Sequence, residues 1–210
     1  GGFDNNLLCI GEKQIIAVGD SYQKTLAAMK RQGAVLLNAQ QLEAIKSEVF
    51  DYKNGVGCGT PVLNRKWVGA NPDALAKIAG LNIDEKVEML IAETDASDPF
   101  VQEEQMMPLL PIVRANDFSQ GLAIAKQSEH GDKHSAMIHT MNVARMTEMG
   151  QAMDTTIFVK NGPCVAGLGM GGEGFISFSI ATTTGEGITT PRTFTRYRRC
   201  TLVNNLNIVT

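Results

Sequence analysis

The sequence predicts an α/β protein with a mainly parallel sheet flanked by helices. Short apolar runs rich in Val and Ile alternate with segments in which apolar residues recur every three or four positions. The links between these segments are short, which favours right-handed crossovers between parallel strands. The chain has 210 residues, of which 43% are hydrophobic and 20% charged, enough for one well-packed core.

The alternation begins near the amino terminus. Residues 14–18 form an apolar, β-branched run typical of a buried strand. Residues 19–21 offer a helix N-cap, and apolar side chains follow on one helical face up to Gly33, which is a plausible stop. A second helix is predicted over 39–50, and the glycine-containing stretch 54–61 is interpreted as an exposed loop. The apolar stripes of the two helices are Tyr22, Leu26 and Met29, and Leu42, Ile45 and Val49.

The same pattern continues through the middle of the chain. A short helix is predicted from Pro72, because proline is favoured in a first helical turn. The acidic stretch 93–104 is interpreted as a loop. Beyond Asn161 the composition changes to Gly, Thr and Ser, with short β-like runs such as 175–180. The other expected elements are strands over 87–92, 109–113, 135–140 and 155–160, and helices after the Asp117 cap and over 142–153.

Composition excludes several classes of function. A net charge of −3 gives no basic footprint for nucleic acid, and no apolar run approaches the ~20 residues that span a bilayer. No signal peptide is visible. The four cysteines lie far apart, which favours reduced cytosolic thiols over disulfides.

Two patterns that suggest ligands are interpreted as coincidental. His130 and His134 lie four residues apart, but Gly131 and Asp132 break the helix that a metal pair at this spacing needs, so no metal site is expected. Residues 167–172 match G-x-G-x-x-G, but a strand-like run follows where the dinucleotide fingerprint requires a helix.

Cys9 is the candidate nucleophile. Glycines and asparagines precede it, and they tolerate the unusual backbone angles of a turn that presents a thiol to a cleft. Local chemistry alone favours a small buried hydrophobe instead, because Leu8 and Ile10 flank the thiol.

A resemblance favours the nucleophile. Residues 3–13, FDNNLLCIGEK, resemble the nucleophile segment of CoA-acylating aldehyde dehydrogenases of the propionaldehyde dehydrogenase type. That segment usually reads Leu-Pro-Cys-Ile-Ala-Glu-Lys, so Leu8 and Gly11 depart from it. The match covers nearly all of this chain but only part of the family's length, since the larger N-terminal cofactor-binding portion is missing. Further matching segments are 103–108, 134–136, 159–163 and 185–200.

The resemblance implies roles for individual residues. Cys9 becomes the catalytic thiol. Glu104, in a segment similar to Glu-Glu-x-Phe-Gly-Pro, becomes the carboxylate that binds the nicotinamide ribose, and Met106 takes the usual aromatic position beside the cofactor. The turn that contains Cys164 and Val165 helps to line the aldehyde pocket, where relatives often carry Ser at the position of Cys164. Two apolar neighbours of the thiol are further candidates for the pocket, Leu8 and Ile10.

The expected function is CoA-dependent oxidation of a short aliphatic, propionaldehyde-like aldehyde to acyl-CoA with NAD reduction, through a cysteine thiohemiacetal and thioester. Residues 1–195 form the catalytic domain. Residues 196–210 carry an extended strand that the resemblance implies pairs with a neighbouring subunit, making a homo-oligomer. A cytoplasmic location is implied, and relatives work in bacterial microcompartments. A hydrolytic aldehyde dehydrogenase and a catalytically incomplete oligomerising fragment remain as alternatives.

Overall fold

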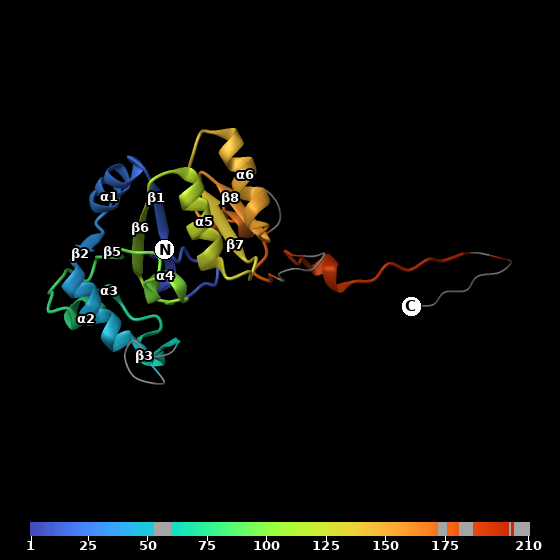
Figure 1. Ribbon diagram of the computed structural model, residues 1–210. Helices are drawn as coiled ribbons and strands as arrows, with labels where there is room; N and C mark the ends of the chain where they lie inside the picture. The colour runs from blue at the N-terminus through green and yellow to red at the C-terminus, as the bar shows by residue number, and fades with distance from the viewer. Residues whose placement is uncertain (53–59, 172–175, 181–186, 202, 204–210) are drawn as a thin grey trace.

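A four-stranded parallel sheet forms the centre of the computed structural model, which describes residues 1–52, 60–171, 176–180, 187–201 and 203. The strand order is β1-β6-β5-β2 (Figure 1). Ile15 of β1 is paired with Ile112 of β6, and Leu90 of β5 with Leu109 of β6. The strands are β1 (Ile15–Val18), β2 (Val35–Leu37), β5 (Leu90–Thr94) and β6 (Leu109–Ala115).

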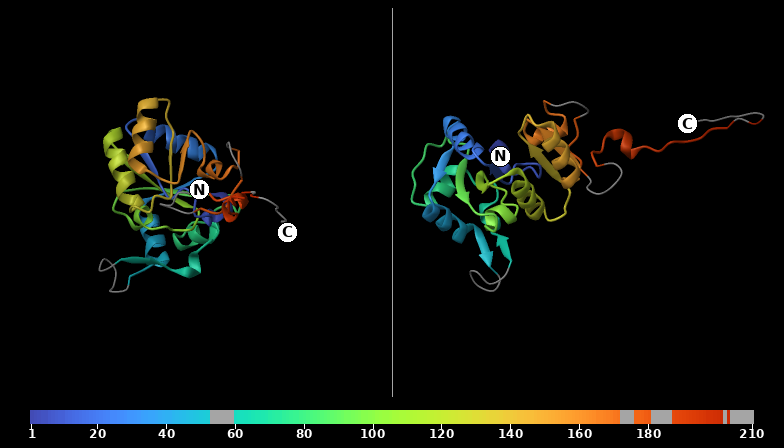
Figure 2. Two further views of the ribbon diagram at one scale, coloured as in Figure 1. Left: turned by 90° about the vertical axis from the view of Figure 1, so that its right-hand side faces the viewer. Right: turned by 45° about the horizontal axis from the view of Figure 1, so that its top comes forward.

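Helices cover both faces of this sheet (Figures 1 and 2). The side chain of Ile91 packs on the face covered by α1, whereas its neighbours Leu90 and Ala92 pack with α2 and α3 on the opposite face. Helix α5 lies on β1, where Gly121 allows close approach to Val18. The helices are α1 (Ser21–Arg31), α2 (Ala39–Val49), α3 (Pro72–Ile78), α4 (Pro99–Gln102), α5 (Phe118–Glu129) and α6 (Val143–Met153).

A second, two-stranded parallel sheet follows α5. Strand β7 (Ser135–Ile138) pairs with β8 (Ile157–Lys160), and α6 forms the crossover and packs beside α5 (Figure 2). A 3₁₀ turn, η3 (Cys164–Leu168), follows β8 directly. Beyond it, η4 (Pro191–Phe194) and the described residues up to 201 lead away from the body of the molecule (Figure 1). The remaining elements are η1 (Phe3–Asn6), η2 (Arg65–Trp67) and the antiparallel pair β3 (Phe50–Tyr52) and β4 (Pro61–Leu63).

The predicted fold class is confirmed, and most of the predicted elements are present with boundaries shifted by a few residues. The largest shift is at β5, which begins at Leu90 rather than at residue 87. The Asp117 cap is confirmed, because its side chain accepts from the Gln120 N–H at 2.8 Å. Gly33 ends α1 with a φ of 88°, which glycine adopts without strain.

Other predictions need correction. Strands β2, β3 and β4 are absent from the sequence prediction, because each has only three residues and shows no clear period. The stretch 93–104 is not a loop throughout, since it contains α4. Within 175–180, the described residues form one isolated bridge, Ile180 to Ile188, rather than a strand. Most of the predicted loop 54–61 and of the predicted strand 200–209 lies outside the described residues.

Among the residues that the structure describes, none of the helices combines the length and the apolar character needed to cross a bilayer.

Asp98 holds the segment between β5 and β6 in place, and its removal should destabilise the fold. Its buried carboxylate accepts from the Phe100 N–H at 2.9 Å and pairs with Lys46 at 2.7 Å. We expect Asp98→Ala to lower the free energy of unfolding by about 3 kcal/mol, because a helix cap and a largely buried ion pair are lost together. Urea titration measures this. Asp73→Ala, which breaks a surface pair with Lys77, is the control, and an equal loss in both variants would contradict this role.

Candidate active site

The segment with the predicted nucleophile and the segment with the predicted cofactor-binding residues, 103–108, each lead into one of two adjacent strands. Cys9 lies in the lead-in to β1, and Glu104 and Met106 lie in the lead-in to β6. Because β1 and β6 are paired in parallel, their amino ends share one edge of the sheet. The sheet therefore brings together two segments that are about 95 residues apart in the sequence, at its amino edge rather than at the carboxyl edge where ligands commonly bind.

Cys9 is exposed at the tip of a tight turn. The Gly11 N–H donates to the Leu8 carbonyl at 2.8 Å, which closes the turn around the thiol. Before the turn, Asp4, Asn5 and Asn6 have φ of 50°, 51° and 60°. These left-handed angles are uncommon outside glycine but are tolerated by Asn and Asp. The thiol thus extends from a locally strained segment, as the glycines and asparagines of the sequence predict.

Asparagine side chains stabilise this strained segment. Asn5 Nδ2 donates to the Gly69 carbonyl at 3.0 Å and to Asn71 Oδ1 at 2.7 Å. Asn6 is buried, and its Nδ2 donates to the Glu12 carbonyl at 3.2 Å, on the far side of the thiol turn. The loop that carries Cys9 is therefore anchored both to a neighbouring segment and across its own base.

The cofactor segment is bonded to both sides of the thiol loop. Gln105, 1% exposed, donates from Nε2 to the Lys13 carbonyl at 2.8 Å and to the Leu109 carbonyl at 3.0 Å. On the other side, the Gly69 N–H donates to the Met106 carbonyl at 2.9 Å, and Gly69 also accepts from Asn5. These bonds hold Glu104, which is exposed, and Met106, which is half-buried, beside the loop that carries Cys9.

Lys13 adds a half-buried cation beneath this edge. Its Nζ donates to the Ser128 carbonyl at 2.6 Å and to the Gln102 carbonyl at 3.2 Å, near the carboxyl ends of α5 and α4. Burial lowers the pKa of Lys13, although the carboxylates of Glu103 and Glu104 act in the opposite direction. A cation at helix carboxyl ends is favourable, so Lys13 fixes the start of β1 against two helices.

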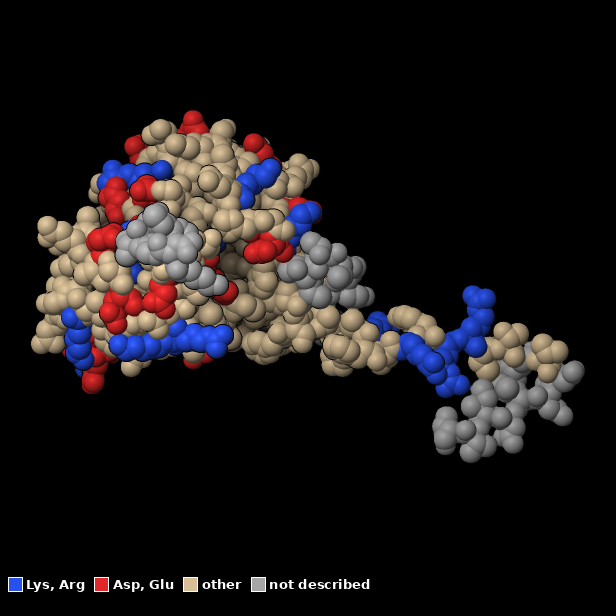
Figure 3. Space-filling model, turned by 60° about the horizontal axis from the view of Figure 1, so that its bottom comes forward, with Lys and Arg blue, Asp and Glu red and all other residues tan. Residues whose placement is uncertain are grey.

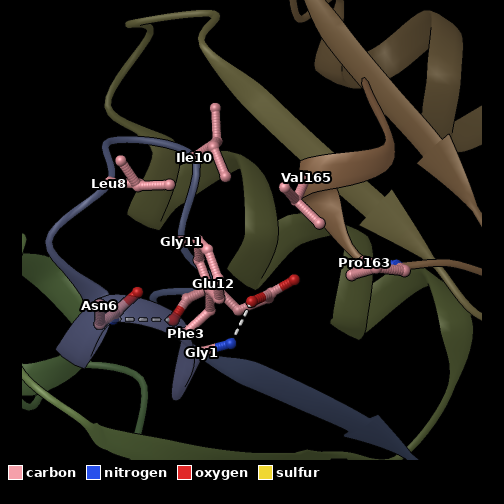
Figure 4. Close-up of a pocket in the computed structure, with 9 residues that line it drawn as sticks. All are labelled: Gly1, Phe3, Asn6, Leu8, Ile10, Gly11, Glu12, Pro163 and Val165. Carbon is pink, nitrogen blue, oxygen red and sulfur yellow. Dashed lines mark hydrogen bonds and ion pairs between the residues drawn. The ribbon is translucent and has the colours of Figure 1, made fainter. Parts of the chain in front are cut away.

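A small, mainly apolar pocket lies between the thiol turn and the residues that follow β8 (Figure 4). Three residues that the sequence analysis assigns to an aldehyde pocket, Leu8, Ile10 and Val165, line it, and Cys9 itself is not among the lining residues. Cys164 does not line it. Its side chain is 3% exposed and packs in the hydrophobic cluster with Ile10, and burial raises the pKa of the Cys164 thiol to about 12.

Glu12 is a pocket residue that the sequence analysis did not single out. One carboxylate oxygen accepts from the Cys164 N–H at 3.1 Å, and the other pairs with the amino group of Gly1 (Figure 4). Glu12, Lys13 and Gln105 lie within the segments that carry the family resemblance, but the sequence does not indicate their partners, which are distant in the chain.

His130, His134 and the described residues 167–171 are not among the residues that line the pocket. His130 ends α5 with a φ of 59°, and its Nε2 contacts the Gln102 carbonyl at 3.0 Å. The part of the chain that the structure describes contains no cluster of three His, Cys, Asp or Glu residues suited to a metal. Residues 167–171 belong to η3 and the turn after it, and the next described residues, 176–180, are not helical, whereas a phosphate-binding loop leads into a helix.

The buried Cys164 thiol should make stability depend on alkaline pH. Its ordinary pKa is 9.0, so between pH 9.0 and about 12 the unfolded chain loses this proton while the folded chain keeps it. Stability therefore falls as pH rises through this window, by at most about 1.4 kcal/mol per pH unit from this thiol. Urea titrations across the window should show a steeper fall for the unmodified protein than for Cys164→Ala. Parallel profiles would contradict the burial of this thiol.

Known proteins resemble the chain over nearly its whole length. A scan against models of protein families gives no match. The acetylating acetaldehyde dehydrogenase EutE of Salmonella typhimurium is 44% identical over 207 residues, which cover 99% of this chain and 44% of EutE.

Solved structures agree with this relationship. A propionaldehyde dehydrogenase of Rhodopseudomonas palustris, solved with bound CoA and an acylated cysteine, is 38% identical with a TM-score of 0.87, over 96% of this chain and 44% of that one. A propionaldehyde dehydrogenase from the fucose utilisation microcompartment of Clostridium phytofermentans is 40% identical with a TM-score of 0.86, over 97% and 45%. The chain thus spans less than half the length of its relatives. By sequence and by fold, it matches one part of the acylating aldehyde dehydrogenases.

Proposed function

We propose that this chain is the thiol-bearing catalytic part of an enzyme that oxidises a short aliphatic aldehyde to acyl-CoA with reduction of NAD. The observation that carries the proposal is the exposed Cys9 turn, bonded through Gln105 and Gly69 to the segment of Glu104 and Met106. A nucleophile and a cofactor-binding carboxylate must be held together for this reaction, and the two lead-ins provide such an arrangement.

The chemistry follows from the thiol. Cys9, as thiolate, adds to the aldehyde carbonyl, and the backbone N–H of Cys9 donates to the oxyanion that forms. When bound, NAD supplies the acceptor for the hydride that leaves the resulting thiohemiacetal. Cys9 then holds the acyl group as a thioester, which the CoA thiolate attacks, forming acyl-CoA and releasing the Cys9 thiolate.

The residues present fit these ligands. The Glu104 carboxylate is exposed and is an acceptor only, so it suits two ribose hydroxyls, with the thioether of Met106 beside it. The apolar walls from Leu8, Ile10 and Val165 suit a short alkyl chain such as that of propionaldehyde. Cys164 supports this pocket from within the core rather than by contact with the aldehyde.

The same proposal includes an N-terminal portion, a homo-oligomer and a location in the cell. The greater length of the relatives supports an N-terminal portion that binds most of the dinucleotide. Residues 1–195 form the catalytic domain, and 196–210 pair with a second copy in a homo-oligomer. Exposed Tyr197 in this segment and exposed Phe194 just before it, with the basic side chains that Figure 3 shows here, support an interface there. The origin of the Clostridium relative supports a cytoplasmic microcompartment as the location.

The proposal is tested through acyl transfer, which needs no dinucleotide. In the reverse of the last step, Cys9 attacks the carbonyl carbon of propionyl-CoA and the CoA thiolate leaves. Incubation with propionyl-CoA should place one propionyl group on the Cys9 peptide, at least roughly 100-fold faster than on the exposed Cys200, as peptide mass spectrometry would measure.

Controls separate the alternatives. Cys9→Ala should abolish the label and Cys200→Ala should retain it, while added CoA should remove the propionyl group as propionyl-CoA. Release of free propionate in the absence of CoA would favour the hydrolytic alternative. A Cys9 that is labelled no faster than Cys200 would leave the chain as a catalytically incomplete fragment.

A further inference from the structure

The two walls of the pocket belong to different parts of the fold. Leu8 and Ile10 lie in the turn that leads into β1 of the four-stranded sheet, whereas Pro163 and Val165 follow β8 of the two-stranded sheet (Figure 4). In the described part of the chain, no strand pairing joins these two sheets. The width of the pocket therefore depends on what fixes the thiol turn relative to η3.

Glu12 makes the polar link between the walls. It follows the thiol turn by one residue, its side chain is 18% exposed, and its Oε1 accepts from the Cys164 N–H at 3.1 Å. That N–H opens η3, where the first backbone donors have no partner within the turn. The preceding Pro163 has no N–H, so Cys164 offers the first backbone donor after Gly162.

The base of Glu12 is itself fixed. Its carbonyl accepts from the buried Asn6 amide at 3.2 Å, and the next residue, Lys13, is held by the carboxyl ends of α4 and α5. The carboxylate thus extends from a rigid base to the opposite wall. A charge-assisted hydrogen bond of this kind is more directional than the apolar packing of Ile10 in the cluster with Cys164 and Leu168.

We propose that Glu12 is a positioning residue that sets the spacing between the thiol turn and η3, and so limits the length of the acyl chain accepted beside Cys9. The inference rests on the proposed acyl-transfer function and goes beyond it by assigning chain-length selection to a residue outside the apolar lining. If apolar packing alone fixes the distance between the pocket walls, the identity of residue 12 should not affect selectivity for acyl-chain length.

The test compares acylation of Cys9 by propionyl-CoA and by hexanoyl-CoA in four forms of the protein: unmodified, Glu12→Gln, Glu12→Leu and Glu88→Ala. Glu12→Gln keeps an oxygen that accepts from the Cys164 N–H, whereas Glu12→Leu fills a similar volume without an acceptor. Glu88 is exposed and lies outside the pocket lining, so Glu88→Ala is the control. The readout is the ratio of the two acylation rates.

We expect Glu12→Leu to raise the rate with hexanoyl-CoA relative to propionyl-CoA by at least roughly tenfold, and the other two variants to stay within about twofold of the unmodified protein. A merely structural role would lower both rates equally and leave the ratio unchanged, which would overturn the inference. An unchanged ratio with unchanged rates would do the same.

Failure of the proposed function can be distinguished from failure of the inference about Glu12. If neither acyl-CoA acylates Cys9 in the unmodified protein, that function fails, and the spacing is tested by alkylation of Cys9 with iodoacetamide and with N-hexyl iodoacetamide. The same selective gain for the longer reagent in Glu12→Leu would support the link between the walls, and equal ratios in all four forms would refute it. Should Glu12→Leu not fold, Glu12→Met replaces it in both assays.

Discussion

The parallel pairing of β1 with β6 is the constraint on which the rest of the site depends. It places the lead-ins of both strands at one edge of the sheet, although they are distant in the sequence. Gln105 then joins the lead-ins by donating to the Lys13 carbonyl, a contact between residues 92 positions apart. Because this amide is buried, water competes poorly for its hydrogen bonds, and the two segments form one unit.

Local strain and long-range hydrogen bonds complement each other around Cys9. Three consecutive left-handed residues cost roughly 1–2 kcal/mol each where the side chain gives no help, and here the Asn5 and Asn6 amides offset part of that cost. The result is an exposed thiol on a rigid support. Glu12 extends the same principle to the second sheet, since its carboxylate reaches η3 from a base that Asn6 and Lys13 hold.

Secondary-structure elements whose sequence patterns are local can be predicted from the sequence. The stripe of α2 and the Asp117 cap depend on residues a few positions apart, and both are predicted correctly. Strand β2 is not predicted, because its three residues are too few to show a period. The roles of Cys9 and Glu104 are assigned by family resemblance. The hydrogen bonds that join their segments can be seen only in the folded chain. Cys164 appears from the sequence as a pocket residue, but adjacent Pro163 and Val165 face the pocket instead.

Hydrogen–deuterium exchange on Gln105→Leu tests most directly whether the thiol loop and the cofactor segment form one unit. Leucine fills a similar volume without the two donors, and Gln102→Leu, on the same segment, is the matched control. We expect faster exchange in Gln105→Leu over both 5–13 and 103–107, with β7 and β8 unchanged and the control like the unmodified protein. Faster exchange confined to 103–107, with 5–13 unaffected, would contradict the account.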